Sequence, residues 1–424
     1  MQRTRMQSTI HRNLLFHLLL LFFFSTVLPL FPLHAQPLRQ NMDELSTFES
    51  DHYRIHTTVP REEARFYARH MDTVFEEYTE RFQALTGQEK IHENMDLYLF
   101  RTQDEYSRYM EKFGIKAALT GGMYFQQGNY KGLATFTRRK IRSISETFST
   151  LQHEGFHQFA AAYIGIDLPI WANEGIAQYF EDGIVIEGER MRLGILNKRR
   201  IRRVKQALQE GTILPFSNLL NMSPQRWQRE IMTDRSKAQV AYAQSWAMVY
   251  FLINAEQRYR KAFVKYLQLI RDGSSSRDAF EETFKTDNPK AFRKAWEKYA
   301  RKMSPGPVAV TEARLNFLGR ALHFFNKEGK EIPDDVDELR RILQRARFRA
   351  TFVTNKIRTT YNAQNDKNFE YPMPDGDSRQ FEMLAPEKEK LPPRITAKDL
   401  SPRPTLAWYE NANGKIMYDI IWEE

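Results

Sequence analysis

Residues 148–163 read FSTLQHEGFHQFAAAY, with apolar residues at the three- and four-residue spacing of a helix that packs on one side. His153 and His157 are four positions apart, so on a helix both imidazoles lie on one face and can bind one zinc ion. Glu154 lies beside them, where its carboxylate can reach a water molecule next to that ion. The pattern predicts a helix over about 143–163 that carries a metal site.

A second segment offers a third ligand. Residues 171–181 read WANEGIAQYFE, and Glu174 stands seventeen residues beyond His157. Two helices joined by a turn of that length can pack antiparallel, which would bring Glu174 beside the histidine pair. Two histidines, one carboxylate and an open fourth position form the ligand set of a catalytic zinc site. The chain of 424 residues has no cysteine, which excludes disulfides, thiolate metal sites and a cysteine nucleophile.

A plainer interpretation of the histidines stays open at this stage. Two histidines on a half-buried helix can be hydrogen-bonded core residues, as we expect for His70 and His92. The two interpretations differ in one respect: only a metal site requires Glu174 to converge on the histidine pair.

The pairing of HEGFH with WANEGIAQYFE resembles the gluzincin metallopeptidases, and most of all exported bacterial proteins of the peptidase-MA-like group. The likeness extends from about residue 50 to 303, and its specific part is residues 148–182. It implies a zincin-like metallopeptidase domain in this part of the chain.

The same resemblance implies roles for individual residues. His153, His157 and Glu174 would be the zinc ligands, and Glu154 would be the general base. A later segment, residues 241–250, resembles the helix that follows the metal helices in that group. Zn²⁺ is therefore the expected cofactor.

Other residues could complete a hydrolytic site. Tyr242 is the first candidate for stabilising an oxyanion and Tyr250 is the alternative, although either tyrosine can instead be a core residue. A metal-binding histidine usually donates its second ring nitrogen to an acid or a carbonyl, and Glu181 or Gln178 can fill that role. The strand expected at 133–136 can offer its edge to an extended peptide.

Together these patterns predict an exported zinc peptidase that hydrolyses peptide bonds of a peptide or protein substrate with a metal-activated water. The aminopeptidase branch of the resemblance carries an acid that holds a free amino terminus. The nearest counterpart here, Gly121-Gly122-Met123-Tyr124, has none, so that branch is not favoured. The alternative function is a non-catalytic envelope binding or scaffold protein that keeps the metallopeptidase fold.

The remaining patterns predict an α+β fold with a small mixed sheet packed on a mainly helical domain. Hydrophobic residues make up 42% of the chain and aromatic residues 13%, enough for a buried core. Strands are expected at 52–57, 95–100, 121–125 and 132–136, and helices at about 60–85, 143–163, 172–182, 195–209, 238–257, 259–271 and 288–303.

Residues 51–303 are assigned to this domain, and 304–310, which include Pro305-Gly306-Pro307, to a linker. Residues 311–424 are expected to form a small C-terminal α+β domain of unknown role. It would be helix-rich to about 357, polar and proline-rich over 371–404, and would end in a hairpin.

The first 35 residues differ from the rest. Three arginines precede an apolar run over 14–31, which predicts a signal peptide cleaved after Ala35 or, if uncleaved, a membrane anchor. In both cases the protein is expected to be exported, to the periplasm or outside the cell. Residues 36–50 are interpreted as a polar linker.

The charge balance bears on partners. The formal charge of +10 falls to +7 without the three N-terminal arginines, and favours an anionic envelope surface as a candidate partner. The densest basic run, residues 198–205, lies in a predicted helix without interleaved aromatic residues. We therefore interpret it as a solvated helix face, and not as a nucleic-acid site. The sequence does not indicate an oligomeric state.

Overall fold

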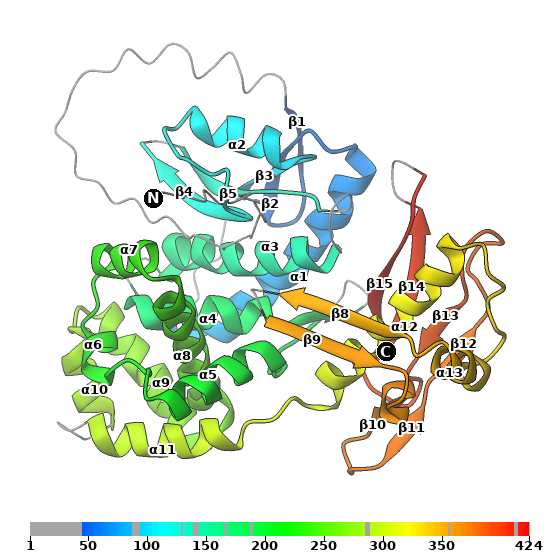
Figure 1. Ribbon diagram of the computed structural model, residues 1–424. Helices are drawn as coiled ribbons and strands as arrows, with labels where there is room; N and C mark the ends of the chain where they lie inside the picture. Colours follow the sequence, from blue (N-terminus) through cyan, green and yellow to red (C-terminus); the bar gives the residue numbers. More distant parts are fainter. Residues whose placement is uncertain are drawn as a thin grey trace, which may run out of the picture.

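The computed structural model describes residues 45–86, 94–128, 130–138, 144–164, 168–186, 190–284, 289–354, 357–410 and 414–423. The fold class is α+β as predicted, with small sheets among many helices (Figure 1). The N-terminal segment 1–35 and His92 lie outside the described residues. Among the helices that are described, none is both long and apolar enough to cross a membrane.

A five-stranded sheet forms the first layer. Its strands are β1 (Ser46–Glu49), β2 (Tyr53–Thr57), β3 (Met95–Phe100), β4 (Gly122–Gln127) and β5 (Tyr130–Phe136). They lie in the order β1-β2-β3-β5-β4, with the three central strands parallel and the outer two antiparallel to their neighbours. The four expected strands are confirmed.

Two expectations about this sheet are wrong. The linker expected over 36–50 ends sooner, because Ser46–Glu49 pair with β2 as strand β1. Residues 133–136 lie in β5, which is paired on both sides, so the edge beside them belongs to β4. The two strands form the β4–β5 hairpin, and the sequence alone does not identify which of them is the outer strand.

Alternating side chains give the sheet two packed faces. Leu97 and Leu99 belong to the main core beneath the sheet, with helices α1 (Arg61–Thr86) and α3 (Ile144–Phe159). Tyr98 and Phe100 face the other way and form a separate aromatic cluster with α2 (Gln103–Glu111). Figure 1 shows α2 above the sheet and α3 and α1 below it.

Helices and one short hairpin follow the sheet among the described residues up to 303. A π-helical turn (Ala160–Ile164) extends α3, and the following elements are α4 (Ile170–Glu181), β6 (Ile184–Ile186), β7 (Arg190–Arg192), α5 (Lys198–Glu210), α6 (Phe216–Leu220), α7 (Pro224–Thr233), α8 (Arg235–Asn254), α9 (Gln257–Arg271), α10 (Ser276–Phe284) and α11 (Pro289–Lys302). The expected helices are confirmed. Sequence analysis missed α6, α7, α10 and the β6–β7 hairpin, which are too short for periodicity to register.

The C-terminal region begins with α12 (Pro307–Lys327), so the linker expected over 304–310 ends at Gly306. It continues with α13 (Val336–Arg345), β8 (Arg349–Thr354), β9 (Ile357–Asn362), η3 (Asp366–Phe369), β10 (Glu370–Pro372), β11 (Ser378–Gln380), β12 (Glu382–Leu384), β13 (Arg394–Thr396), β14 (Arg403–Glu410) and β15 (Ile416–Glu423). The predicted hairpin is confirmed as β14–β15, in a sheet of order β12-β13-β14-β15.

One further expectation for this region is corrected. Helix ends at Arg345 and not near 357, because residues 349–362 form the β8–β9 hairpin. The polar, proline-rich segment over 371–404 contributes the short strands β11, β12 and β13. The region buries its own hydrophobic core, from Leu315 to Trp408.

The basic run is largely not a solvated face. Lys198 Nζ donates to the Tyr361 hydroxyl at 3.1 Å, and Arg202 Nη1 donates to Thr359 Oγ1 at 3.3 Å. Both partners lie on β9, and Figure 1 shows the β8–β9 hairpin reaching across toward α5. Through these contacts α5 joins the C-terminal region to the helical one.

Candidate metal centre

Two glycines allow α3 and α4 to pack closely against their neighbours. A Cβ at Gly155 would lie 2.7 Å from Met71 Cε and 3.2 Å from Tyr78 Oη on α1. A Cβ at Gly175 would lie 2.5 Å from the backbone oxygen of Ser245 on α8. Because a backbone atom cannot swing aside as a side chain can, α4 approaches α8 this closely only with glycine. Both glycines sit inside the motifs, beside the proposed ligands.

His153, His157 and Glu174 converge from these two helices. His153 Nε2 lies 3.6 Å from Glu174 Oε2, and His157 Nε2 lies 3.9 Å from Glu174 Oε1. One ligand atom from each residue lies within 4.8 Å of the others. Ligand atoms about 2.0–2.1 Å from one tetrahedral ion are about 3.3 Å apart, slightly closer than these pairs. Glu174 therefore converges on the histidine pair, as the metal-site interpretation requires and the core-histidine interpretation does not.

Oxygen atoms behind the histidines set their ring orientation. His153 Nδ1 lies 3.0 Å from Glu181 Oε2, and His157 Nδ1 lies 3.0 Å from Asn173 Oδ1. These oxygens accept hydrogen bonds, so each Nδ1 carries a proton and each Nε2 is left facing Glu174 as the nitrogen that could bind a metal. Of the two predicted candidates, Glu181 has the supporting role behind His153. Sequence analysis missed Asn173, whose only signal is its position before Glu174.

Glu154 is fixed beside the three ligands. The backbone N–H of Tyr124, on edge strand β4, donates to Glu154 Oε2 at 3.0 Å. Burial raises the pKa of Glu154 to about 8. Its second oxygen, Oε1, is buried and has no hydrogen-bond partner among the described residues. One oxygen of the carboxylate is therefore anchored to the sheet and the other is available for another group.

Tyr242 lies near the same acids, whereas Tyr250 does not reach them. Burial raises the pKa of the Tyr242 hydroxyl, and the charge of Glu174 raises it further. That hydroxyl is buried and makes no hydrogen bond within the described ranges, and the ring packs edge-on against Trp227 at 5.1 Å. Tyr250 donates its hydroxyl to the backbone oxygen of Gly194 at 3.1 Å, so it is occupied elsewhere.

Unpartnered buried atoms provide the test of whether an ion fits. His153 Nε2, Glu174 Oε2 and Glu154 Oε1 are all buried without a hydrogen-bond partner in the part of the chain that is described. Buried polar atoms are rarely left unsatisfied, and a cluster of them indicates a missing ion or water. Two imidazole nitrogens and a carboxylate are ligands that zinc accepts. The donor set fits a divalent cation.

The electrostatics of the cluster agree with that fit. Burial works to lower the pKa of His153, but the contacts with Glu174 and Glu181 raise it to about 10. Burial also raises the pKa of Glu174 and lowers that of His157. The acids thus favour a positive charge at His153 Nε2, the place where a cation would lie.

His70 shows what an ordinary core histidine looks like in this protein. Its ring stacks on Phe148 with centroids 3.8 Å apart, and burial lowers its pKa to about 3. It has no place in the His-His-Glu cluster. His153 and His157 differ because carboxylate and amide oxygens surround them.

Gln178 and Arg200 form a further ring of contacts behind the ligands. Gln178 Nε2 donates to the backbone oxygens of Glu174 and Tyr242, at 3.1 Å each. Arg200 Nη2 pairs with Glu181 Oε2 at 2.7 Å. Sequence analysis missed Arg200 because it stands in the basic run, where nothing distinguishes it from its neighbours.

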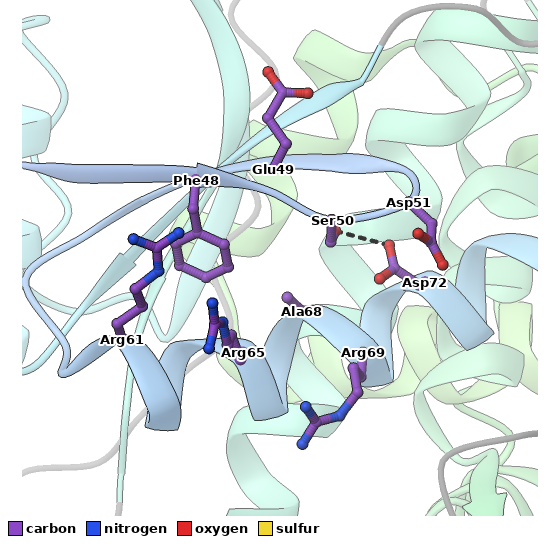
Figure 2. Close-up of a pocket in the computed structure, with 9 residues that line it drawn as sticks. All are labelled: Phe48, Glu49, Ser50, Asp51, Arg61, Arg65, Ala68, Arg69 and Asp72. Carbon is purple, nitrogen blue, oxygen red and sulfur yellow. Dashed lines mark hydrogen bonds between the residues drawn. The ribbon is translucent and has the colours of Figure 1, made fainter.

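The site is enclosed. Each of the four site residues is only 0–2% exposed: His153, Glu154, His157 and Glu174. A hollow of about 250 Å³ lies elsewhere, between the β1–β2 turn and α1 (Figure 2). It is lined by Phe48, arginines of α1 and acids such as Asp72, and by none of the four site residues. That hollow is not the proposed site.

Comparison with known proteins adds little about chemistry. Residues 147–275, which span both metal helices and α8, match a family described as a protein of unknown function (DUF1570). A search of curated proteins finds no match to the chain.

Proposed function

We propose that this protein is a zinc-dependent peptidase that hydrolyses peptide bonds in a peptide or protein substrate. The observation that carries the proposal is the convergence of His153, His157 and Glu174 with Glu154 beside them. Two histidines and a carboxylate leave a fourth coordination position for a substrate or a water, as in hydrolytic zinc sites. We also propose that the protein acts after export, near an anionic envelope surface.

An ion held by the three ligands would act as a Lewis acid on a substrate carbonyl and lower the pKa of a neighbouring water. Glu154 would take a proton from that water as oxygen attacks the carbonyl carbon, and would pass it to the leaving amine. The Tyr124 N–H holds this carboxylate by one oxygen and leaves the other to accept the proton. Positive charge beside Glu154 favours its ionised form, which the base requires.

The Tyr242 hydroxyl is proposed to donate a hydrogen bond to the oxyanion as the carbonyl carbon becomes tetrahedral. It is buried near Glu174 and has no other acceptor among the described residues. A donor that is already in place costs no reorganisation in the transition state.

Strand β4 is the proposed backbone-binding edge for the substrate. It is the outer strand of the sheet, and Tyr124 on it contacts Glu154 through its backbone. An extended peptide could add to this edge by main-chain hydrogen bonds, which read the backbone independently of sequence.

A second candidate function rests on the enclosure of the site. With all four side chains 0–2% exposed, a bound metal could be structural and the protein a non-catalytic binding or scaffold protein of the envelope. In that case the metal would stabilise the α3–α4 pair without meeting a substrate.

Zinc content and a peptide library separate these functions. Purified protein should contain about one zinc per chain by elemental analysis and should cleave members of a broad peptide library. Glu154→Gln should abolish cleavage while zinc content and folding persist, and exposed Glu80→Gln is the matched control. Protein that holds zinc but cleaves nothing in the library supports a scaffold function with a structural metal. Protein without zinc contradicts the peptidase and supports a scaffold protein that keeps the fold with an empty site.

A further inference from the structure

Arg200 on α5 contacts α4 and Asp182, the residue that follows the last turn of α4. Its Nη2 pairs with Glu181 Oε2 at 2.7 Å and its Nε pairs with Asp182 Oδ2 at 3.0 Å. Its Nη1 also donates to Gln178 Oε1. The side chain is only 17% exposed, so these pairs are well shielded from water.

Each partner of Arg200 is tied to a different part of the proposed site. Glu181 accepts a hydrogen bond from Nδ1 of the proposed ligand His153. Gln178 holds the backbone oxygens of Glu174 and Tyr242, and so connects α4 to α8. Through Glu181, the Arg200 guanidinium is therefore connected to the proposed ligand His153. Through Gln178, it is connected to the proposed ligand Glu174 and to Tyr242.

The chemistry of guanidinium suits this arrangement. Arginine presents several N–H donors in a rigid plane, and here three of its nitrogens serve three partners at fixed angles. Lysine could supply the positive charge but not the three directions. Asn197 supports the arrangement by donating to Asp182 Oδ1 at 2.7 Å.

Removing Arg200 would leave buried acids without their counter-charge. Glu181 and Asp182 are adjacent in the chain, and Glu174 and Glu154 stand nearby. A buried carboxylate that loses its partner either moves toward solvent or finds another donor. Either movement would turn Glu181 away from His153 Nδ1 and loosen the ring orientation that faces Nε2 toward the site.

We propose that Arg200 is a positioning residue that orients His153 through Glu181 and braces Glu174 and Tyr242 through Gln178. The inference rests on the proposed function, because it assumes that His153 and Glu174 bind a metal. It predicts that a residue of the basic run, outside both metal motifs, sets the affinity and geometry of the metal site.

Metal binding by variants of the full chain tests this inference. Zinc affinity is measured by competition with a chromophoric chelator, and coordination geometry by the visible absorption of the Co²⁺-loaded protein. Arg200→Met should weaken zinc binding about 10- to 100-fold, the usual effect of changing a residue behind a metal ligand, and should alter the Co²⁺ spectrum. Arg200→Lys should recover part of the affinity.

Arg203→Met is the matched control. Arg203 lies on the same helix but donates to Gln239 Oε1 at 2.6 Å, away from α4. This variant should keep the affinity and the Co²⁺ spectrum of the parent. Circular dichroism and thermal unfolding show whether each variant is folded.

A double variant guards against a fold defect. Glu181→Gln should weaken zinc binding, and Arg200→Met added to it should cause a smaller further loss than Arg200→Met causes alone, because only the contact through Gln178 is then left to lose. Arg200→Met and Arg200→Lys that bind zinc and Co²⁺ like the parent would overturn the inference and leave the proposed function intact. Should Arg200→Met fail to fold, Arg200→Lys and Glu181→Gln decide the question. A parent protein that binds no zinc would overturn both.

Discussion

The α3–α4 region and the C-terminal region are both built around a helix with a buried glycine and a histidine, yet they treat buried polar atoms differently. In the C-terminal region, Thr396 and Thr405 hydrogen-bond each other at 2.9 Å, and Thr311 donates to Pro307 O at 2.7 Å. Around α3 and α4, three such atoms lie together without hydrogen-bond partners among the described residues: His153 Nε2, Glu174 Oε2 and Glu154 Oε1. In the C-terminal region His323 Nδ1 also lacks a partner, but it belongs to no such cluster of described residues. Hydrogen-bonded pairs such as these threonines stabilise the fold, whereas a cluster of unpartnered buried polar atoms indicates a missing ion or water.

That difference predicts unequal effects of removing a histidine. His157→Ala should lower zinc affinity by more than about 100-fold, beyond the 10- to 100-fold typical of residues behind a ligand. At zinc concentrations about 100 times its Kd, the parent should gain about 2.7 kcal/mol of stability, and the variant should gain less than about 0.4 kcal/mol. Thermal unfolding with and without zinc measures both.

The matched change in the other region is His323→Ala. His323 stacks near Trp408 with centroids 6.4 Å apart and belongs to no metal cluster among the described residues. It should leave the zinc-dependent rise in stability unchanged. If both variants lose the zinc-dependent rise in stability equally, the two regions do not differ in their contribution to zinc binding.

The two helical glycines allow a second, smaller contrast. Gly175→Ala forces a Cβ to 2.5 Å from the Ser245 backbone oxygen and should cost about 1–3 kcal/mol of stability, because neither helix can give way. Gly319→Ala meets only side-chain atoms, Tyr418 Cε2 at 2.7 Å and Leu406 Cδ1 at 2.8 Å. Since side chains can shift more than backbone and alanine favours helix by about 1 kcal/mol, Gly319→Ala should destabilise the protein less than Gly175→Ala does.

Midpoints of thermal unfolding for the two alanine variants measure this contrast. Gly175→Ala should also weaken zinc binding, because Glu174 is its neighbour in the chain. If Gly319→Ala proves the more destabilising, the C-terminal region is packed more rigidly than its side-chain contacts indicate.

The sequence predicted α3, α4 and the convergence of their side chains well because the signals are local. HEGFH and the spacing to Glu174 specify both residue types and a helical face, and the structure brings those residues together. The confirmed long helices likewise carry a repeating apolar pattern over several turns. Glu181 was identifiable for the same reason, being two turns beyond Glu174 on one helix.

What the sequence could not provide depends on contacts between distant segments. Arg200 is distinguished only by α5 lying against α4, eighteen or more residues from its partners Asp182 and Glu181. Strand β4 became the edge only through the pairing order of the sheet. The short strands of 371–404 have too few residues each for alternation to stand out against proline and charge.

A third prediction concerns the carboxyl group of Glu312, which lies at the junction of the two regions. Glu312 on α12 is half-buried near Arg199, Asp419 and Asp182, and burial, opposed by Arg199, raises its pKa to about 7. The folded state therefore holds a proton on Glu312 that the unfolded chain has lost above about pH 4.5. Stability from this group should fall as pH rises from about 4.5 to 7, by about 1 kcal/mol after solvent screening.

Glu312→Gln isolates that contribution from other titrating groups. Subtracting the stability of the variant from that of the parent at each pH should give a difference that declines across this window and is flat above it. A flat difference for Glu312→Gln would mean that the junction is open to water.

The smallest expected effect concerns the contact between α5 and the β8–β9 hairpin. Tyr361→Phe removes the hydroxyl that accepts a hydrogen bond from Lys198 at 3.1 Å, but keeps the ring, whose centroid lies 5.4 Å from Lys198 Nζ. The loss should be less than about 1 kcal/mol, as for other partly exposed charged contacts, and zinc affinity should not change. Thermal unfolding and the chelator competition measure the two quantities. Because Lys198 and Arg200 are two residues apart on the same helix, a weaker zinc site in Tyr361→Phe would mean that the hairpin controls the position of Arg200, and the two regions would then act as one unit.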